Sequence, residues 1–179
     1  ALAAAGYGFD KAIFAYGITS SPVSMSNLVS NSGVIASDVT GVGTARYSLA
    51  ASRYGGLAGG KAIFAYGETA SGYLSMSNLV SSSGVVASDV SGVGTARSYL
   101  AAAGYGGDKA IFGYGTTGSK VSLTNLVSNS GVVAADVTGV GTARDGLAAA
   151  NYGGDKAIFG YGNTGSYVSI TNLVNNSGV

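Results

Sequence analysis

One seven-residue stretch, Lys-Ala-Ile-Phe followed by a small residue, Tyr and Gly, recurs four times and constrains the fold more than any other feature. Its copies begin at Lys11, Lys61, Lys109 and Lys156. An Asn-Leu-Val segment and a later Gly-Val-Gly-Thr-Ala-Arg segment also recur, with 19 positions from Asn to Arg, as between Asn27 and Arg46. A sequence period of about 20–50 residues is typical of solenoids, propellers and other repeat arrays. We therefore expect an array of like units.

These landmarks divide the 179 residues into four repeats of about 47 residues, with approximate boundaries 1–45, 46–96, 97–143 and 144–179. Differences in length are confined to two connections, which we expect to be exposed loops. The fourth copy stops before the counterpart of Asp136, so we expect it to be incomplete and to lack its outer strand. Because the chain begins at Ala1 rather than Met, we expect an exported, processed product or a segment of a longer protein.

Each repeat is expected to contain four short strands separated by turn residues. Taken from the last two copies, these strands are 147–150, 156–161, 168–174 and 132–137. The Ala-rich segment is too short for a helix because a glycine turn follows it. In the Lys-Ala-Ile-Phe strand both alternating sides are apolar, which is typical of a strand covered on both faces. The pattern predicts an all-β, β-propeller-like array of four-stranded antiparallel blades, with a β-solenoid as the alternative.

The order of elements resembles that of a kelch-type propeller repeat. The residues that carry the resemblance are Arg144, then 147–150, 154–162 and 171–174. Two features differ from the kelch pattern, because a Tyr-Gly pair stands where a Gly-Gly pair is usual and the chain has no Trp. Repeats rich in Gly, Ala and Tyr also resemble those of tailed-phage and microbial surface proteins. The resemblance implies a binding or structural scaffold rather than one reaction.

Composition argues against several classes of function. Charged residues make up 9% of the chain, the net charge is +1 and no basic run occurs, so we expect no nucleic-acid partner. The chain has no Cys and no His, which removes disulfides, thiolate and imidazole metal ligands, and the triads that use them. We expect no enzyme and no cofactor. No apolar run of about 18 residues occurs, so we expect no membrane insertion.

The few charged residues repeat in register, which favours structural roles over catalytic ones. One set occupies the same position in all four repeats: Lys11, Lys61, Lys109 and Lys156. In a second set an aspartate stands eight residues before an arginine: Asp38 and Arg46, Asp89 and Arg97, and Asp136 and Arg144. We expect each arginine to pair with an aspartate of its own or an adjacent blade and to fix the turn there.

Four tyrosines stand outside the regular positions and are the expected surface contacts. Tyr73 and Tyr167 lie in the variable connections, and Tyr47 and Tyr99 follow an arginine. Exposed tyrosines stack on sugars and are frequent in adaptable binding surfaces. Carbohydrate is therefore the expected small-molecule partner.

Near-identical, weakly charged repeats predict a structural protein of an extracellular filament or virion appendage. We expect it to associate with itself, as an oligomer or filament, through its ends or an unpaired edge strand. The alternative is a lectin-like or receptor-binding propeller. Its contact face would consist of the variable connections 18–26, 68–77, 116–124 and 163–171, which differ while the framework around them does not.

Overall fold

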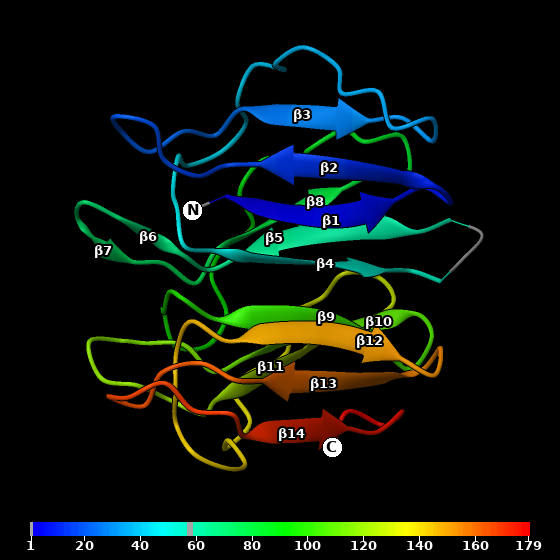
Figure 1. Ribbon diagram of the computed structural model, residues 1–179. Coiled ribbons are helices and arrows are strands. Elements are labelled where there is room, and N and C mark those ends of the chain that lie inside the picture. Colours follow the sequence, from blue (N-terminus) through cyan, green and yellow to red (C-terminus); the bar gives the residue numbers. More distant parts are fainter. Residues whose placement is uncertain (1, 57–58) are drawn as a thin grey trace.

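A computed structural model describes residues 2–56 and 59–179 (Figure 1). These residues form strands, isolated bridges and turns, which confirms the predicted all-β class. The part of the chain that the structure describes contains no helix of the length and hydropathy needed to cross a membrane.

The described residues form four three-stranded antiparallel sheets, one within each predicted repeat range. The first two sheets contain β1 (Ala3–Tyr7), β2 (Lys11–Ala15) and β3 (Ser26–Val29), and β4 (Ala50–Tyr54), β5 (Lys61–Ala65) and β8 (Ser77–Val80). The last two contain β9 (Ala101–Tyr105), β10 (Lys109–Gly113) and β11 (Thr124–Val127), and β12 (Ala148–Tyr152), β13 (Lys156–Gly160) and β14 (Thr171–Val174). A small hairpin of β6 (Glu68–Thr69) and β7 (Gly72–Tyr73) lies between β5 and β8.

Each sheet is a meander with its second strand in the centre. Along β2, Ile13 pairs with Ala5 and Phe14 with Ala4, so the two large side chains point to opposite faces. An apolar side chain on each face suits a strand that is covered on both sides, as β5 and β10 are inside the stack. The small alanines of the first strands allow neighbouring sheets to approach closely, and β1, β4, β9 and β12 pack against one another in that order.

The predicted fourth strand does not form, so the prediction of four-stranded blades is wrong. Segment 132–137 makes two isolated bridges to β11, one from Val133 and one from Val137, and the equivalent segments of the first two repeats do the same. Asp136 lies between these bridges and accepts hydrogen bonds from Asn125 and Thr95. The segment is thus held by the side chain of Asp136 and by isolated bridges, and not by the consecutive backbone hydrogen bonds of a fourth strand. Each sheet therefore ends at its third strand.

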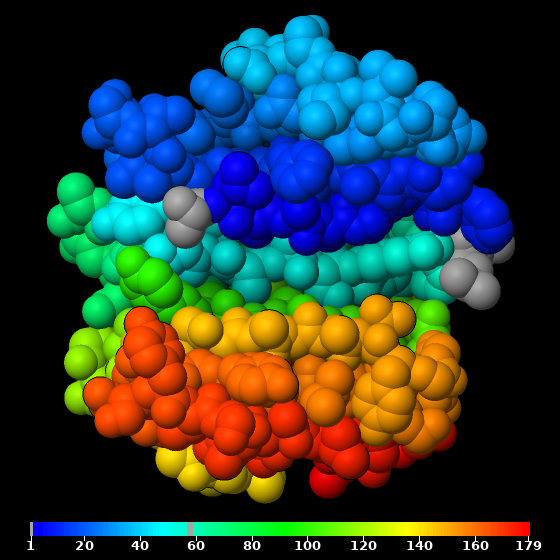
Figure 2. Space-filling view, viewed as in Figure 1, coloured from blue at the N-terminus to red at the C-terminus, as the bar shows by residue number. Residues whose placement is uncertain are grey.

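The four sheets stack face to face in sequence order, from blue at the top to red at the bottom of Figure 2. The first strands lie together in the middle of Figure 1, whereas β3 and β14 lie at opposite ends. Every sheet ladder in the described residues is antiparallel and stays within one repeat. Solenoid strands instead pair from coil to coil, so the solenoid alternative does not describe this fold. In the residues described, the stack does not close on itself.

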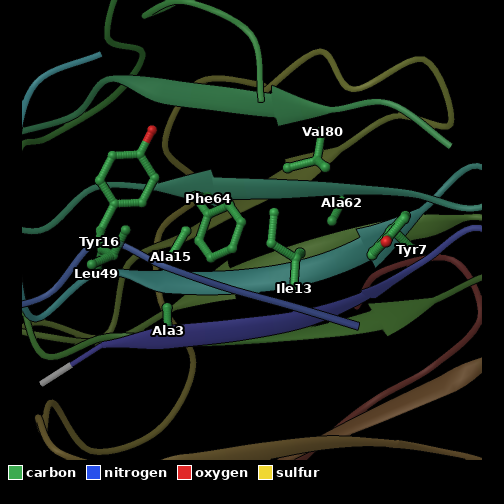
Figure 3. Packing of buried hydrophobic residues seen from close by; sticks show 9 residues of the cluster. All are labelled: Ala3, Tyr7, Ile13, Ala15, Tyr16, Leu49, Ala62, Phe64 and Val80. Carbon is green, nitrogen blue, oxygen red and sulfur yellow. The ribbon is translucent and has the colours of Figure 1, made fainter. Parts of the chain in front are cut away.

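Three apolar clusters hold the four sheets together, one between each consecutive pair. In the first cluster, Ile13 and Tyr16 of the first sheet meet Phe64 and Val80 of the second (Figure 3). Burying a side chain of this size contributes about 1.5–3 kcal/mol, so each interface is a small hydrophobic core. The stability of the array therefore comes from contacts between neighbouring sheets.

Candidate functional site: the junction between consecutive sheets

Each junction is built around one arginine from the linker that joins two sheets. Arg46, Arg97 and Arg144 are completely buried. Burial lowers the pKa of Arg46 and Arg97, but a guanidinium stays charged at neutral pH. A buried charge is costly unless it is fully hydrogen-bonded, so the surroundings of these arginines identify the groups on which the junction depends.

The guanidinium of Arg46 lies between an aromatic ring and a set of oxygen acceptors. Its Nε donates to the Tyr66 carbonyl at 2.9 Å, its Nη2 to Asn78 Oδ1 at 2.7 Å and its Nη1 to the Thr44 carbonyl at 3.1 Å. On the other side, its Cζ is 4.3 Å from the centre of the Tyr16 ring. Such a cation–π contact is worth about 2 kcal/mol when it is desolvated. The arginine therefore contacts both sheets at once.

The second junction repeats this geometry, and the third repeats most of it. Arg97 donates from Nε to the Tyr114 carbonyl at 2.9 Å and from Nη2 to Asn125 Oδ1 at 2.6 Å. Arg144 donates from Nε to the Tyr161 carbonyl at 2.8 Å. The rings stacked on Arg97 and Arg144 lie 4.2 and 4.1 Å away. A charge that recurs in the same hydrogen-bonded position at every junction holds neighbouring sheets together.

An aspartate that follows the third strand of the next sheet completes the first two junctions. Asp89 accepts hydrogen bonds from the Thr44 amide at 2.9 Å, the Thr44 hydroxyl at 2.7 Å and Asn78 Nδ2 at 2.9 Å. Arg46 Nη1 lies 3.9 Å from Asp89 Oδ1, and Arg97 Nη1 lies 3.8 Å from Asp136 Oδ1. Of the two partners expected, the structure thus places Arg46 beside Asp89 and Arg97 beside Asp136, rather than beside the aspartate eight positions before each arginine.

The protonation behaviour of these aspartates reflects their hydrogen bonds. Burial raises the pKa of Asp89, but hydrogen bonds from Thr44 and Asn78 and the charge of Arg46 outweigh it, so the pKa lies below its usual value. The same balance lowers the pKa of Asp136. The ionised carboxylate is therefore the form that stabilises the junction.

A tyrosine with an unusual backbone conformation contributes the ring and one of the carbonyls. Tyr16, Tyr66, Tyr114 and Tyr161 have φ between 62° and 65°, a region that non-glycine residues rarely adopt. In this conformation the Tyr66 carbonyl accepts from Arg46 while its ring contacts Arg97. Burial raises the pKa of Tyr16 and Tyr66 to about 12, against the opposing effect of the arginine. Tyr161 has the same φ although it is 63% exposed, so the conformation does not depend on a neighbouring sheet that covers the ring.

Two asparagines, Asn78 and Asn125, are junction residues that the sequence pattern marked only as landmarks; Asn27 and Asn172 occupy the same position in the first and last repeats. Asn78 and Asn125 are fully buried and bridge arginine to aspartate. The signal that could have identified them is a polar residue inside an apolar strand, 11 positions before an aspartate in the first three repeats. A buried amide at a fixed distance from a charge indicates a hydrogen-bonded pair.

The repeated lysines lie away from the junctions, at the exposed turns between first and second strands. Lys109 and Lys156 contact the preceding aspartates Asp108 and Asp155 at 2.8 and 2.7 Å, and Lys11 is 4.0 Å from its own preceding aspartate. Lys61 follows a glycine instead and is exposed. Exposed pairs of this kind contribute little to stability.

The tyrosines expected as surface contacts differ in exposure. Tyr167 is 91% exposed and Tyr99 47% exposed, while Tyr47 and Tyr73 are half-buried. The variable connections that contain or adjoin them form small hairpins on one side of the stack, seen at the left of Figure 1. Among the described residues, no group of three or more carboxylate, Cys or His side chains could hold a metal ion.

A groove of about 550 Å³ runs along the first strands of all four sheets. Alanine and glycine line most of it, and its polar groups include Ser52, Arg53 and Asn151. Arg53 donates to the Gly8 and Gly56 carbonyls at 3.2 and 2.9 Å, which fixes it at one wall. The groove presents hydroxyl, amide and guanidinium groups to a polar ligand.

The outermost sheets each leave uncovered a face that is buried elsewhere in the stack. On the first sheet this head face contains Phe14, Val29 and Ile35; on the last sheet the tail face contains Tyr152, Tyr161 and Leu173. Phe14 is 37% exposed and Tyr161 63%, although their counterparts Phe64 and Tyr66 are fully buried. The two faces therefore present the two halves of an interface that the molecule already makes three times.

The chain matches no family model and no curated protein.

Proposed function

We propose that the chain is a structural repeat module that associates end to end, its sheets acting as kelch-like blades of an open, propeller-like array. We place it in an extracellular filament or virion appendage, with no catalytic role. The observation that supports this proposal best is the match between the head face and the tail face. Because the faces are different surfaces, their contact is head-to-tail, which continues into a filament or closes into a ring.

The glycine that follows each third strand shows how closely the two faces match. A side chain at Gly84 would collide with the ring of Tyr7 and with Leu28 of the preceding sheet. The tail-face counterparts of that ring and leucine are Tyr152 and Leu173, which are 39% and 65% exposed. The head-face counterpart of Gly84 is Gly33, beside which a side chain would meet open space. A second copy would therefore place an aromatic ring over Gly33.

Sedimentation velocity over a range of protein concentrations tests the proposal. Wild-type protein should form larger species as concentration rises, and Leu173→Lys should remain monomeric because it places a charge in the apolar contact. The matched control is Val85→Lys, since Val85 is also 65% exposed but lies in the second repeat. Negative-stain images would then separate filaments from rings. Monomeric wild-type protein at all concentrations, or equal effects of the two lysines, would contradict the proposal.

A second candidate function is display of the variable connections to a carbohydrate or receptor. The observation in its favour is the gathering of these hairpins on one side of the stack, with the ring of Tyr167 91% exposed (Figure 1). A glycan array probed with wild-type protein and Tyr167→Ser tests it. Binding that is lost in the variant would support display, and an array without bound glycans would exclude a lectin. The groove beside Arg53 is the other place for a sugar, and binding there would survive Tyr167→Ser.

A further inference from the structure

One corner of the head face has the groups that hold an arginine elsewhere in the molecule. Asn27 Nδ2 donates to Asp38 Oδ1 at 2.7 Å and to the Ala36 carbonyl at 3.2 Å. The corresponding amide of Asn78 donates to Asp89 at 2.9 Å and to a backbone carbonyl at 3.0 Å. The amide and the carboxylate are therefore in place before any partner arrives.

The two corners differ in what occupies them. At Asn78 the amide oxygen accepts from Arg46, and Asp89 accepts from the amide and hydroxyl of Thr44. Asn27 Oδ1 and Asp38 Oδ2 receive no hydrogen bond from the residues that the structure describes. Asn27 is half-buried and Asp38 exposed, whereas Asn78 is fully buried. The first sheet thus has acceptors of the same kind without the donors.

The chemistry of these acceptors selects a guanidinium. A carboxylate, an amide oxygen and the Tyr16 carbonyl correspond to the groups that accept from Thr44 and Arg46 at the second sheet. A planar fork of several N–H groups satisfies acceptors spread in this way, whereas the compact ammonium of lysine does not. The Thr amide and hydroxyl add two donors for the carboxylate.

We propose that the corner formed by Asn27 and Asp38 binds a Gly-Val-Gly-Thr-Ala-Arg segment presented by another molecule built of the same repeat. The interface is continuous with one that the chain makes three times, and the charges are complementary. A second copy of residues 1–179 cannot supply the arginine, because its own three are buried in its own junctions. The inference deepens the proposed function, since it names the segment that a longer molecule of the same repeat would add to the contact at the head face.

An NMR titration with a synthetic peptide tests the site. The peptide has the sequence of residues 91–99, Ser-Gly-Val-Gly-Thr-Ala-Arg-Ser-Tyr. Added to the isotope-labelled protein, it should shift the side-chain amide of Asn27 and the backbone amides around Tyr16 and Asp38. A peptide with Ala in place of Arg should bind at least about tenfold more weakly, because hydrogen bonds to charged groups are worth about 1.5–3 kcal/mol. A peptide with Lys at that position should also bind more weakly.

Two protein variants complete the experiment. Asp38→Asn should weaken binding about tenfold. Asp10→Asn, which alters another exposed carboxylate of the first sheet with an asparagine donor, should leave it unchanged. The proposal is overturned if no shifts arise at Asn27 up to about 5 mM peptide, a Kd range that corresponds to only about 3 kcal/mol. It is also overturned if the arginine-free peptide binds equally well. Either result would leave the self-association measured by sedimentation unaffected, so the two proposals fail separately.

Discussion

The second and third junctions use the same buried arginine but differ by one carboxylate and one amide. Arg97 has Asp136 at 3.8 Å and donates to Asn125 Oδ1, while among the described residues Arg144 has neither an ion pair with an aspartate nor a hydrogen bond to the corresponding Asn172. Both side chains are nevertheless fully buried, and both lie 4.1–4.2 Å from a tyrosine ring. The ring and the backbone carbonyls are therefore sufficient to bury the guanidinium. The carboxylate mainly fixes the threonine loop before the arginine, as its bonds to Thr95 show.

Removal of the arginine should have the largest effect and should differ between these junctions. Arg97→Leu leaves the Tyr114 carbonyl and the buried Asn125 without their donor, and we expect it to lower the free energy of unfolding by about 3–5 kcal/mol. Arg144→Leu should cost less, because Arg144 donates to backbone carbonyls alone and its loss leaves no buried amide or carboxylate without a partner. Urea unfolding measures the free energy of unfolding of both variants, and hydrogen exchange shows which sheets lose amide protection. Equal costs, or an unchanged Arg97→Leu curve, would show that the junctions do not differ in this way.

A methyl group at the linker glycine tests how tightly the carboxylate side is packed. A side chain at Gly94 would collide with Asp136 and Asn125, and its φ is +74°. Gly107 has a similar φ of +78° but open space around it. Gly94→Ala should therefore destabilise the protein by about 1–3 kcal/mol more than Gly107→Ala, the excess being the cost of overpacking. If the two alanine variants have the same melting temperature, backbone strain alone explains the glycine.

Neutralising the carboxylate separates its role from that of the arginine. Asp136→Asn should cost about 1–2 kcal/mol, since it weakens the bonds from Thr95 and Asn125 at a site that is a quarter exposed. Asp38→Asn is the matched control, because Asp38 is exposed and receives only the bond from Asn27. It should leave the unfolding curve nearly unchanged. A control variant as unstable as Asp136→Asn would mean that the aspartate stabilises through its asparagine rather than through the threonine and arginine of the linker.

Acid should act on both junction carboxylates at once, and its effect should be the most gradual. Because folding lowers the pKa of Asp89 and Asp136, the stabilisation is fully present above the unfolded pKa of about 3.9 and is lost as pH falls through the folded values. Unfolding measured from pH 6 down to about pH 2.5 should show this loss. The Asp89→Asn, Asp136→Asn double variant should show a shallower loss, while the lysine-paired Asp108 and Asp155 remain as a common background. Parallel pH profiles would argue against a stabilising carboxylate at the junctions.

The sequence predicted the first three strands of each repeat because their signals are local. Lys-Ala-Ile-Phe alternates apolar residues between Gly-rich turns, and β10 and β13 lie within the ranges expected from it. The prediction of a fourth strand was wrong although valines alternate in this segment. Asp136 lies between them, and its hydrogen-bond partners Asn125 and Thr95 lie 11 and 41 positions away. The local strand propensity of a segment carries no information about contacts with residues that far away in the sequence.

The candidate site was only partly predictable for the same reason. Their repeated positions identified the arginines and aspartates. The aspartate eight positions before each arginine and the aspartate after the next sheet both remained possible partners. The choice depends on stacking order, which brings Arg46 to the sheet that follows it and to Asn78, 32 positions away. The asparagines were missed because an amide inside a strand gains meaning only when its neighbours in space are known.

A mixing experiment tests the match between the end faces most directly. Phe14→Lys blocks the head face and leaves the tail face intact, while Leu173→Lys does the reverse. Each variant alone should sediment as a monomer, and an equimolar mixture should form dimers and nothing larger, because only one productive contact remains between the two. A mixture that stays monomeric, or a single variant that still associates, would contradict head-to-tail assembly.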